Sequence, residues 1–176
     1  MSDQRWLWSI RLSAKEYYRL RKFHSTDAEA LYEALKDEKV VRHMASTGIT
    51  LQDCEKIIKE ASEHWKKYQI GSWAVVNSVT DKIIGWAGFK RIAPSGIELL
   101  VVLSPSHWGI GTAITGDLID KAKNKYRLNK IYVLLPETRK SFRFIKKLGF
   151  VYEGKAKYAN EPFLKFVMVF DGSNSL

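Results

Sequence analysis

The stretch from Leu99 to Ala122, LLVVLSPSHWGIGTAITGDLIDKA, constrains the fold most. It begins as an apolar run, breaks at residues 104–106, passes through Gly109 and Gly111, and then takes on helical periodicity. A helix that starts after a strand and a glycine turn exposes its first N–H groups, which carry partial positive charge. Because glycine lets a ligand approach the backbone closely, the pattern indicates either a phosphate or pyrophosphate site or a turn that needs glycine for geometry alone.

The strand that enters this turn is predicted to be central in a sheet. Residues 97–103, IELLVVL, are apolar on both alternating faces, which is typical of a strand covered on both sides. The helix after the turn carries Ile114 and Leu118 one turn apart, and residues 130–135, KIYVLL, form the next strand. Two strands joined by a helix predict a parallel crossover.

The rest of the chain supplies the remaining elements of a mixed α+β fold. Thr26 with Glu29, and Thr50 with Asp53, have the spacing of capping boxes at the starts of two helices. Gly85 and Gly88 predict a bulge or a close approach within their strand. The order is β-α-α-β-β-β-α-β-α-β-β, with further strands at 17–23, 72–79, 82–89, 150–156 and 163–170, a helical turn at 40–45, and a helix at 138–147. We expect the fourth strand to splay at the glycine turn and helices to cover both faces.

The length and net charge of the chain limit which functions it can have. We expect one domain over residues 1–176, with a loose arm at 1–14 and a polar tail at 171–176. The net charge of +10 favours anionic partners such as phosphorylated cofactors, with a solvated basic surface as the alternative. The Lys and Arg residues are spread along the chain, so no direct nucleic-acid binding is expected.

Cysteine and histidine usage argues against a disulfide framework and a metal site. Cys54 is the sole cysteine and falls on the apolar face of its helix, which indicates a core residue. The four histidines are isolated, and none has metal-ligand spacing with another. The sequence carries no signal-peptide pattern and no run of about 18 apolar residues, so we expect a cytoplasmic protein that does not span a membrane.

Four segments are informative when taken together: LRKF with TDAEALY (20–32), KVVRHM (39–44), LSPSHWGIGTA (103–113) and ETRKSFRFIKKLGF (137–150). They resemble the GNAT superfamily of acyl-CoA-dependent N-acetyltransferases, and most closely its ribosomal-protein N-terminal acetyltransferase branch. The similarity runs from about residue 17 to 170 and implies a mostly antiparallel, twisted sheet of about seven strands.

The resemblance implies acetyl-CoA as co-substrate and assigns residues to it. Backbone N–H groups of the turn would hold the CoA pyrophosphate, and Leu103 would pair with the pantetheine arm. Trp108 stands where the family has Gln or Arg, and Thr138 stands where it has Asn. The turn residues assigned in this way are Trp108, Gly109, Ile110, Gly111, Thr112 and Ala113.

The tyrosine that protonates the CoA thiolate in many members would fall on Ile145, so that role is vacant. Ser141, which matches the family position, is the candidate donor, with helix capping as the alternative. Arg143, Lys146 and Lys147 are candidates for the 3′-phosphate of CoA, with solvent exposure as the alternative for each.

The reaction also needs a base that deprotonates the amine, and the main candidates are carboxylates. Glu98 is the lone charge in an otherwise apolar strand, where burial would raise its pKa and suit it to general-base work, directly or through water. The alternative is a solvated carboxylate at the mouth of the strand. Glu137 and Tyr158 are weaker candidates. A backbone N–H between Leu100 and Val102 would polarise the thioester carbonyl.

The sequence therefore predicts an N-acetyltransferase that moves an acetyl group from acetyl-CoA to a primary amine in a ternary complex. The amine belongs to a protein or peptide N-terminus or to a small molecule, and the basic surface argues mildly against polycationic acceptors. A homodimer is left open. The alternative, prompted by Trp108, Thr138 and Ile145, is a CoA-binding regulatory module with weak catalysis.

Overall fold

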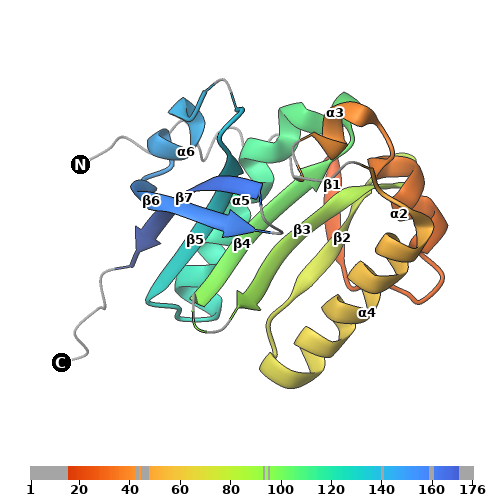
Figure 1. Ribbon diagram of the computed structural model, residues 1–176. Coiled ribbons are helices and arrows are strands. Elements are labelled where there is room, and N and C mark those ends of the chain that lie inside the picture. Colours follow the sequence, from red (N-terminus) through yellow and green to blue (C-terminus); the bar gives the residue numbers. More distant parts are fainter. Residues whose placement is uncertain are drawn as a thin grey trace.

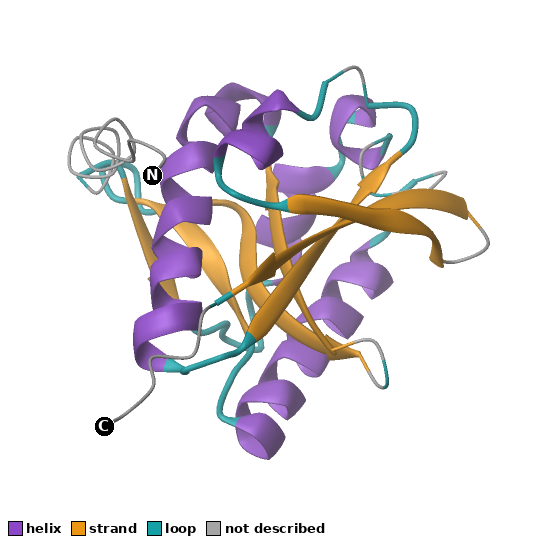
Figure 2. Cartoon of the chain, turned by 90° about the vertical axis from the view of Figure 1, so that its left-hand side faces the viewer, coloured by secondary structure: helices purple, strands orange, loops and turns teal. Residues whose placement is uncertain are grey.

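A seven-stranded sheet with helices on both faces forms the protein (Figures 1 and 2). The computed structural model describes residues 16–42, 44, 48–92, 94, 96–139, 141–158 and 161–170. The strands are β1 (Tyr18–Arg21), β2 (Ser72–Asn77), β3 (Ile83–Ile92), β4 (Gly96–Leu103), β5 (Lys130–Pro136), β6 (Val151–Tyr158) and β7 (Glu161–Val169). The helices are α2 (Ala28–Leu35), α3 (Glu38–Val41), α4 (Leu51–Tyr68), the 3₁₀ helix η1 (Pro105–Ile110), α5 (Gly111–Asp120), the π-helical η2 (Lys121–Lys125) and α6 (Arg143–Lys147).

The strand order is β1-β2-β3-β4-β5-β7-β6, and every pair is antiparallel except β4 with β5. This arrangement confirms the predicted mixed fold, its mostly antiparallel sheet and the parallel crossover through the helix that follows β4. Gly85 confirms the predicted close approach, because a Cβ there would collide with the carbonyl oxygen of Val102 on β4.

Two hydrophobic cores lie on opposite faces of the sheet, as strand alternation requires. The larger core packs α5 and α6 against one face through residues such as Ile114, Leu118 and Ile145. The smaller core packs α2 and α4 against the other face and includes Cys54, which is fully buried. The prediction that Cys54 is a core residue is therefore confirmed, and burial raises the pKa of its thiol to about 11.

The sheet opens between β4 and β5. The two strands pair at one position, Glu98 opposite Tyr132, and beyond it their backbones diverge. The predicted splay at the fourth strand is thus confirmed, and it begins earlier than the glycine turn, within the first residues of β4.

Three local predictions are corrected or fall outside the described residues. The Thr26–Glu29 capping box is wrong, because α2 is preceded by Asp27, whose carboxylate instead binds Arg21 at 2.6 and 2.9 Å. The Thr50–Asp53 capping box is confirmed. The helix predicted at 138–147 forms only from Arg143, and the segments 1–14 and 171–176 lie outside the described part of the chain.

Candidate active site

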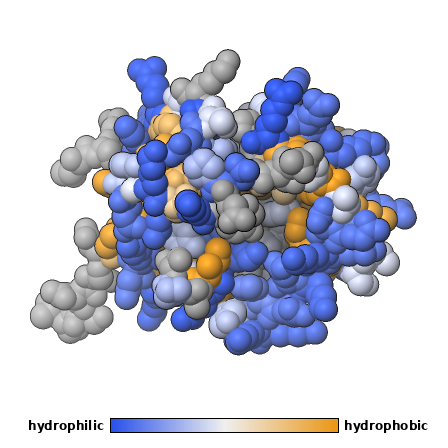
Figure 3. All heavy atoms as spheres, viewed as in Figure 1, coloured by the Kyte–Doolittle hydropathy of each residue, from blue (hydrophilic) through white to orange (hydrophobic). Residues whose placement is uncertain are grey.

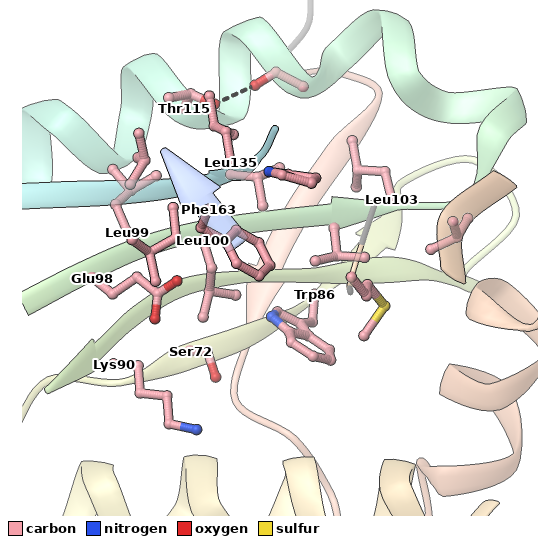
Figure 4. A pocket seen from close by; sticks show the side chains of 18 of the residues that line it. Ser72, Trp86, Lys90, Glu98, Leu99, Leu100, Leu103, Thr115, Leu135 and Phe163 are labelled. Atoms are coloured by element: carbon pink, nitrogen blue, oxygen red, sulfur yellow. Dashed lines mark hydrogen bonds between the residues drawn. The ribbon is translucent and has the colours of Figure 1, made fainter. Parts of the chain in front are cut away.

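A cavity of about 1170 Å³ passes through the opening between β4 and β5. One end is lined by the end of β4, the glycine turn and the segment that follows β5. The other end is lined by α3, α4 and β3 (Figure 4). β4 crosses the whole cavity, since every residue from Glu98 to Leu103 lines it. A ligand in the opening would therefore lie along an unpaired strand edge.

The turn after β4 departs from the predicted bare helix start. The 3₁₀ helix η1 fills residues 105–110, and the N–H of Gly111 donates to the carbonyl oxygen of Trp108. Ser104 and Ser106 fix the His107 ring, with Oγ to Nδ1 distances of 2.8 and 3.0 Å. The N–H of Gly111 is thus already bonded within the turn, and the turn itself is held rigid by side chains.

Trp108, which stands in place of the family's Gln or Arg, closes this turn. Its Nε1–H donates to the carbonyl oxygen of Leu103 at 2.9 Å, so the ring spans from η1 back to the last residue of β4. The ring is 44% exposed and lines the cavity. The Trp108 side chain therefore braces the turn and also forms part of the cavity wall.

The structure brings some of the predicted cofactor residues to the cavity and leaves others away from it. The predicted residues that line it are Leu103, Trp108, Gly111, Thr112, Thr138 and Ser141. Those that do not line it are Gly109, Ile110, Ala113 and Arg143. Ala113 is fully buried in the core beneath α5, whereas Arg143 is exposed, as are Lys146 and Lys147.

Ser141 lies at the surface of the cavity just before α6. Its Oγ accepts a hydrogen bond from the N–H of Arg143 at 3.3 Å, although the residue at the N-cap of α6 is Phe142. Accepting that bond leaves the hydroxyl proton free for another partner, so the contact is compatible with proton donation. Ile145 is buried in the core and also lines the cavity, which leaves the family's tyrosine position apolar.

Arg139 is a site residue that the sequence reasoning did not find. It follows β5, is half-buried and lines the cavity. Burial lowers the pKa of its guanidinium, and no acidic side chain among the described residues offsets that cost. A half-buried cation without a carboxylate is suited to an anionic ligand. The sequence feature that could have identified Arg139 is its position directly after Thr138, in the segment 137–150 that resembles the family.

Glu98 lies where β4 and β5 make their single pairing, and its half-buried side chain lines the cavity. Burial raises the pKa of its carboxyl to about 7, and nearby Lys90 opposes part of that shift. Within the described residues the carboxyl makes no hydrogen bond or ion pair, because Lys90 binds Glu60 instead, at 3.0 Å. The predicted direction of the Glu98 pKa shift is confirmed.

The other candidates for the base are less well placed. Glu137 does not line the cavity and pairs with Lys155 at 3.0 Å on the surface. The side chain of Tyr158 lies outside the described part of the structure. Glu98 is therefore the candidate base that the cavity best supports.

The end of the cavity under α4 carries both signs of charge. Asp53 is engaged by the backbone and hydroxyl of Thr50, and Glu60 by Lys90. The charged residues that line this end are Lys39, Arg42, Lys56 and Lys90, with Asp53, Glu60 and Glu98. Glu60 is thus balanced by a lysine, whereas the hydrogen bonds from Thr50 lower the pKa of Asp53 and keep it negatively charged. The surface in the view of Figure 3 is mostly hydrophilic, with small hydrophobic groups between.

Within the described ranges, no three His, Cys, Asp or Glu side chains converge as metal ligands, and no helix combines the length and apolar character needed to cross a bilayer.

A sheet that opens at its fourth strand, with a glycine turn at the mouth of the opening, agrees with the class of acyl-CoA-dependent transferases that the sequence resembles. The family model described as Acetyltransferase (GNAT) domain matches residues 18–151. The chain therefore belongs to the GNAT acetyltransferase family, whose members use acetyl-CoA as co-substrate. The resemblance seen in the sequence is confirmed.

Solved structures of this family share the fold at low sequence identity. A GNAT-family acetyltransferase from Bacillus anthracis is 20% identical, with a TM-score of 0.67 over 88% of this chain and 95% of that one. The ribosomal-protein-S5-alanine acetyltransferase from Vibrio fischeri is 23% identical, with a TM-score of 0.65 over 89% and 95%. The aminoglycoside acetyltransferase AAC(6')-Ib in complex with coenzyme A is 17% identical, with a TM-score of 0.67 over 86% and 94%. No curated protein sequence matches the chain.

Proposed function

We propose that the protein transfers the acetyl group of acetyl-CoA to a primary amine, with Glu98 as the general base. The observation that carries the proposal is the free, half-buried carboxyl of Glu98 in the cavity, with its pKa near 7. A base with that pKa is half ionised near neutrality, so it takes a proton and returns to its starting state readily.

The chemistry is a direct transfer. Glu98 removes one proton from the ammonium form, directly or through water, and the amine nitrogen attacks the thioester carbonyl carbon to give a tetrahedral intermediate. As the C–S bond breaks, the nitrogen loses its second proton to solvent and the leaving thiolate takes a proton. The Ser141 hydroxyl is the candidate donor of that proton, and water then reprotonates it. A backbone N–H of β4 between Leu100 and Val102, on the edge that faces the opening, is the candidate group that stabilises the developing oxyanion.

The cofactor end of the cavity accommodates the remainder of acetyl-CoA. The unpaired edge of β4 suits the extended pantetheine arm, and the turn at Gly111 and Thr112 suits the diphosphate. Arg139 supplies a cation across the opening from that turn, and we assign it to a phosphate of the cofactor rather than Arg143, which does not line the cavity.

The first experiment is a calorimetric titration with acetyl-CoA, followed by turnover with a panel of primary amines. We expect one-to-one binding and acetylated amine as product. Binding without turnover of any amine would favour the regulatory module, and absence of binding at millimolar acetyl-CoA would overturn both functions. Glu98→Gln separates the roles, because it should abolish turnover and leave binding intact.

A further inference from the structure

Lys90 faces Glu98 across the sheet, yet the lysine is bound elsewhere. The two residues lie directly opposite each other in the register of β3 and β4, where the Cβ atoms of facing residues are about 5 Å apart. A lysine side chain is long enough to span that gap. Instead, the Lys90 ammonium lies 3.0 Å from a carboxylate oxygen of Glu60 on α4. Figure 4 shows Lys90 extended towards that helix and away from the Glu98 carboxyl.

Solvation explains why Lys90 binds Glu60. The two side chains are 32% and 36% exposed, so both charges keep part of their hydration. The Glu98 carboxyl is poorly solvated, since burial raises its pKa to about 7, and near neutrality it carries its charge only part of the time. Glu60 is therefore the stronger competitor for the ammonium. With the charge of Glu60 removed, Glu98 is the acid directly opposite Lys90 in the sheet.

The charged and titratable side chains around Glu98 come from α3 and its C-cap, α4, β3, β5 and β7. They are Lys39, Arg42, Asp53, Lys56, Glu60, His64, Lys90, Tyr132 and Lys165, whose ammonium lies 4.8 Å from the centroid of the Tyr132 ring. Among them, Lys90 is the one whose charge acts on the pKa of the Glu98 carboxyl, and it lowers that pKa against the effect of burial. A change in the position of Lys90 is therefore the change to which Glu98 responds most strongly.

We propose that Glu60 is a positioning residue, which binds Lys90 and so holds the ammonium away from the Glu98 carboxylate that receives the proton of the amine. Without the charge of Glu60, Lys90 turns to Glu98. The ion pair so formed would occupy the oxygen that must accept a proton and would make the carboxylate a weaker base. This inference rests on the proposed function, since it concerns the base of that same reaction.

The test follows the Glu98 carboxyl directly, by 13C NMR of the whole chain labelled at the side-chain carboxyl carbon of glutamate. Glu98→Gln identifies the Glu98 signal, whose titration midpoint is measured in wild type, Glu60→Gln, Lys90→Met and the double variant. Glu137→Gln is the matched control, because Glu137 also pairs with a lysine at 3.0 Å but does not line the cavity. The protein is titrated alone, so the result does not depend on turnover.

We expect a wild-type midpoint near pH 7 and a midpoint lower by about one pH unit or more in Glu60→Gln, because an opposite charge that moves close favours the carboxylate. Lys90→Met should raise the midpoint above the wild-type value. Adding Glu60→Gln to Lys90→Met should then change it by less than about 0.3 pH units, since Glu60 acts through Lys90. Glu137→Gln should leave the midpoint unchanged.

An unchanged midpoint in Glu60→Gln would overturn the inference. An equal lowering by Glu60→Gln with and without Lys90 would overturn it as well, because Glu60 would then act on Glu98 by its own charge.

The proposed function fails in a different way. The dependence of kcat on pH is measured with the panel amine that the wild type acetylates fastest, and its inflection should follow the NMR midpoints. Midpoints that move as expected while the inflection stays the same in every variant would remove Glu98 as the base and leave the contact between Glu60 and Lys90 standing.

Discussion

The two ends of the cavity are built in different ways. The end proposed for the cofactor is formed by the end of β4, the turn that leads into α5, and the segment after β5 that carries Arg139. The end proposed for the acceptor is formed by side chains from α3, α4, β3 and β4, which come together only in the folded chain. The first end thus draws on two short segments, whereas the second draws on residues scattered over about 60 positions of sequence, from Lys39 to Glu98.

The largest expected effect on acetyl-CoA binding alone comes from a bulky side chain in the glycine turn. A Cβ on Gly111 would lie 3.7 Å from Cδ1 of Leu103, an ordinary contact, so Gly111→Ala should bind acetyl-CoA within about 3-fold of wild type. Gly111→Trp projects a bulky ring into the cavity and should weaken binding about 100-fold or more. Calorimetry measures both variants. Tight binding by Gly111→Trp would show that the diphosphate lies elsewhere.

At the acceptor end, the largest expected effect is the loss of turnover when the candidate base Glu98 is replaced. Glu98→Gln should lower kcat about 100-fold or more and leave the Kd for acetyl-CoA unchanged, because the amide cannot take a proton. Glu137→Gln is the control, because Glu137 does not line the cavity and pairs with Lys155, and this variant should retain most of the activity. A Glu98→Gln enzyme with full turnover across the pH range would remove Glu98 from the mechanism.

The pH profile of the wild type reports on the same group. Since the raised pKa of Glu98 is about 7, the carboxylate that acts as base is lost as pH falls through that value. We expect log kcat to rise with pH and level off above about 7.5, with the inflection removed in Glu98→Gln. An inflection that persists unchanged in the variant would assign the titration to another group, such as the amine itself.

Arg139 and Arg143 sharpen the comparison at the cofactor end. Arg139→Ala should raise the Kd for acetyl-CoA about 10-fold, because it removes a half-buried cation that lines the cavity. Arg143→Ala should change the Kd less than about 2-fold, since Arg143 is exposed and away from the cavity. The reverse order of the two effects would restore the assignment made from the sequence.

The smallest expected effect is on stability. A carboxyl whose pKa is raised in the folded state favours folding while it is protonated, and that contribution is lost as pH rises from its unfolded value of 4.5 towards 7. Glu98→Gln, which does not titrate, should therefore gain more in Tm over wild type at pH 8 than at pH 5. Thermal unfolding at the two pH values checks this, and an equal difference at both would mean that Glu98 is solvated.

The fold was largely predictable because its signals are local. Short sequence patterns predict three of its elements. They are strand β4, which is apolar on both alternating faces, the Thr50–Asp53 capping box of α4, and the helix α5 that connects β4 to β5. The Thr26–Glu29 box failed because Asp27 gains more from Arg21, a tertiary contact that spacing alone does not reveal. The start of the splay at Glu98 likewise depends on how β5 approaches, which the sequence of β4 does not contain.

The site was predictable only in part for a related reason. Glu98 could be found because a charge in an apolar strand is unusual in itself. Trp108 could be placed in the turn but not seen to donate to Leu103, and Arg139 has no local feature that separates it from Arg143.

The single pairing between β4 and β5 gives the molecule an edge strand in its interior. Edge strands expose unpaired backbone groups and are sites where another chain can add a strand and begin aggregation. The outer edge strand β6 bears Glu153, Lys155 and Lys157, charges that discourage such pairing. The inner edge of β4 is protected differently, because it lies within one sheet, between its neighbour β3 and the diverging strand β5. A narrow, extended ligand can pair with this edge, whereas the strand of a second folded sheet has no room beside it.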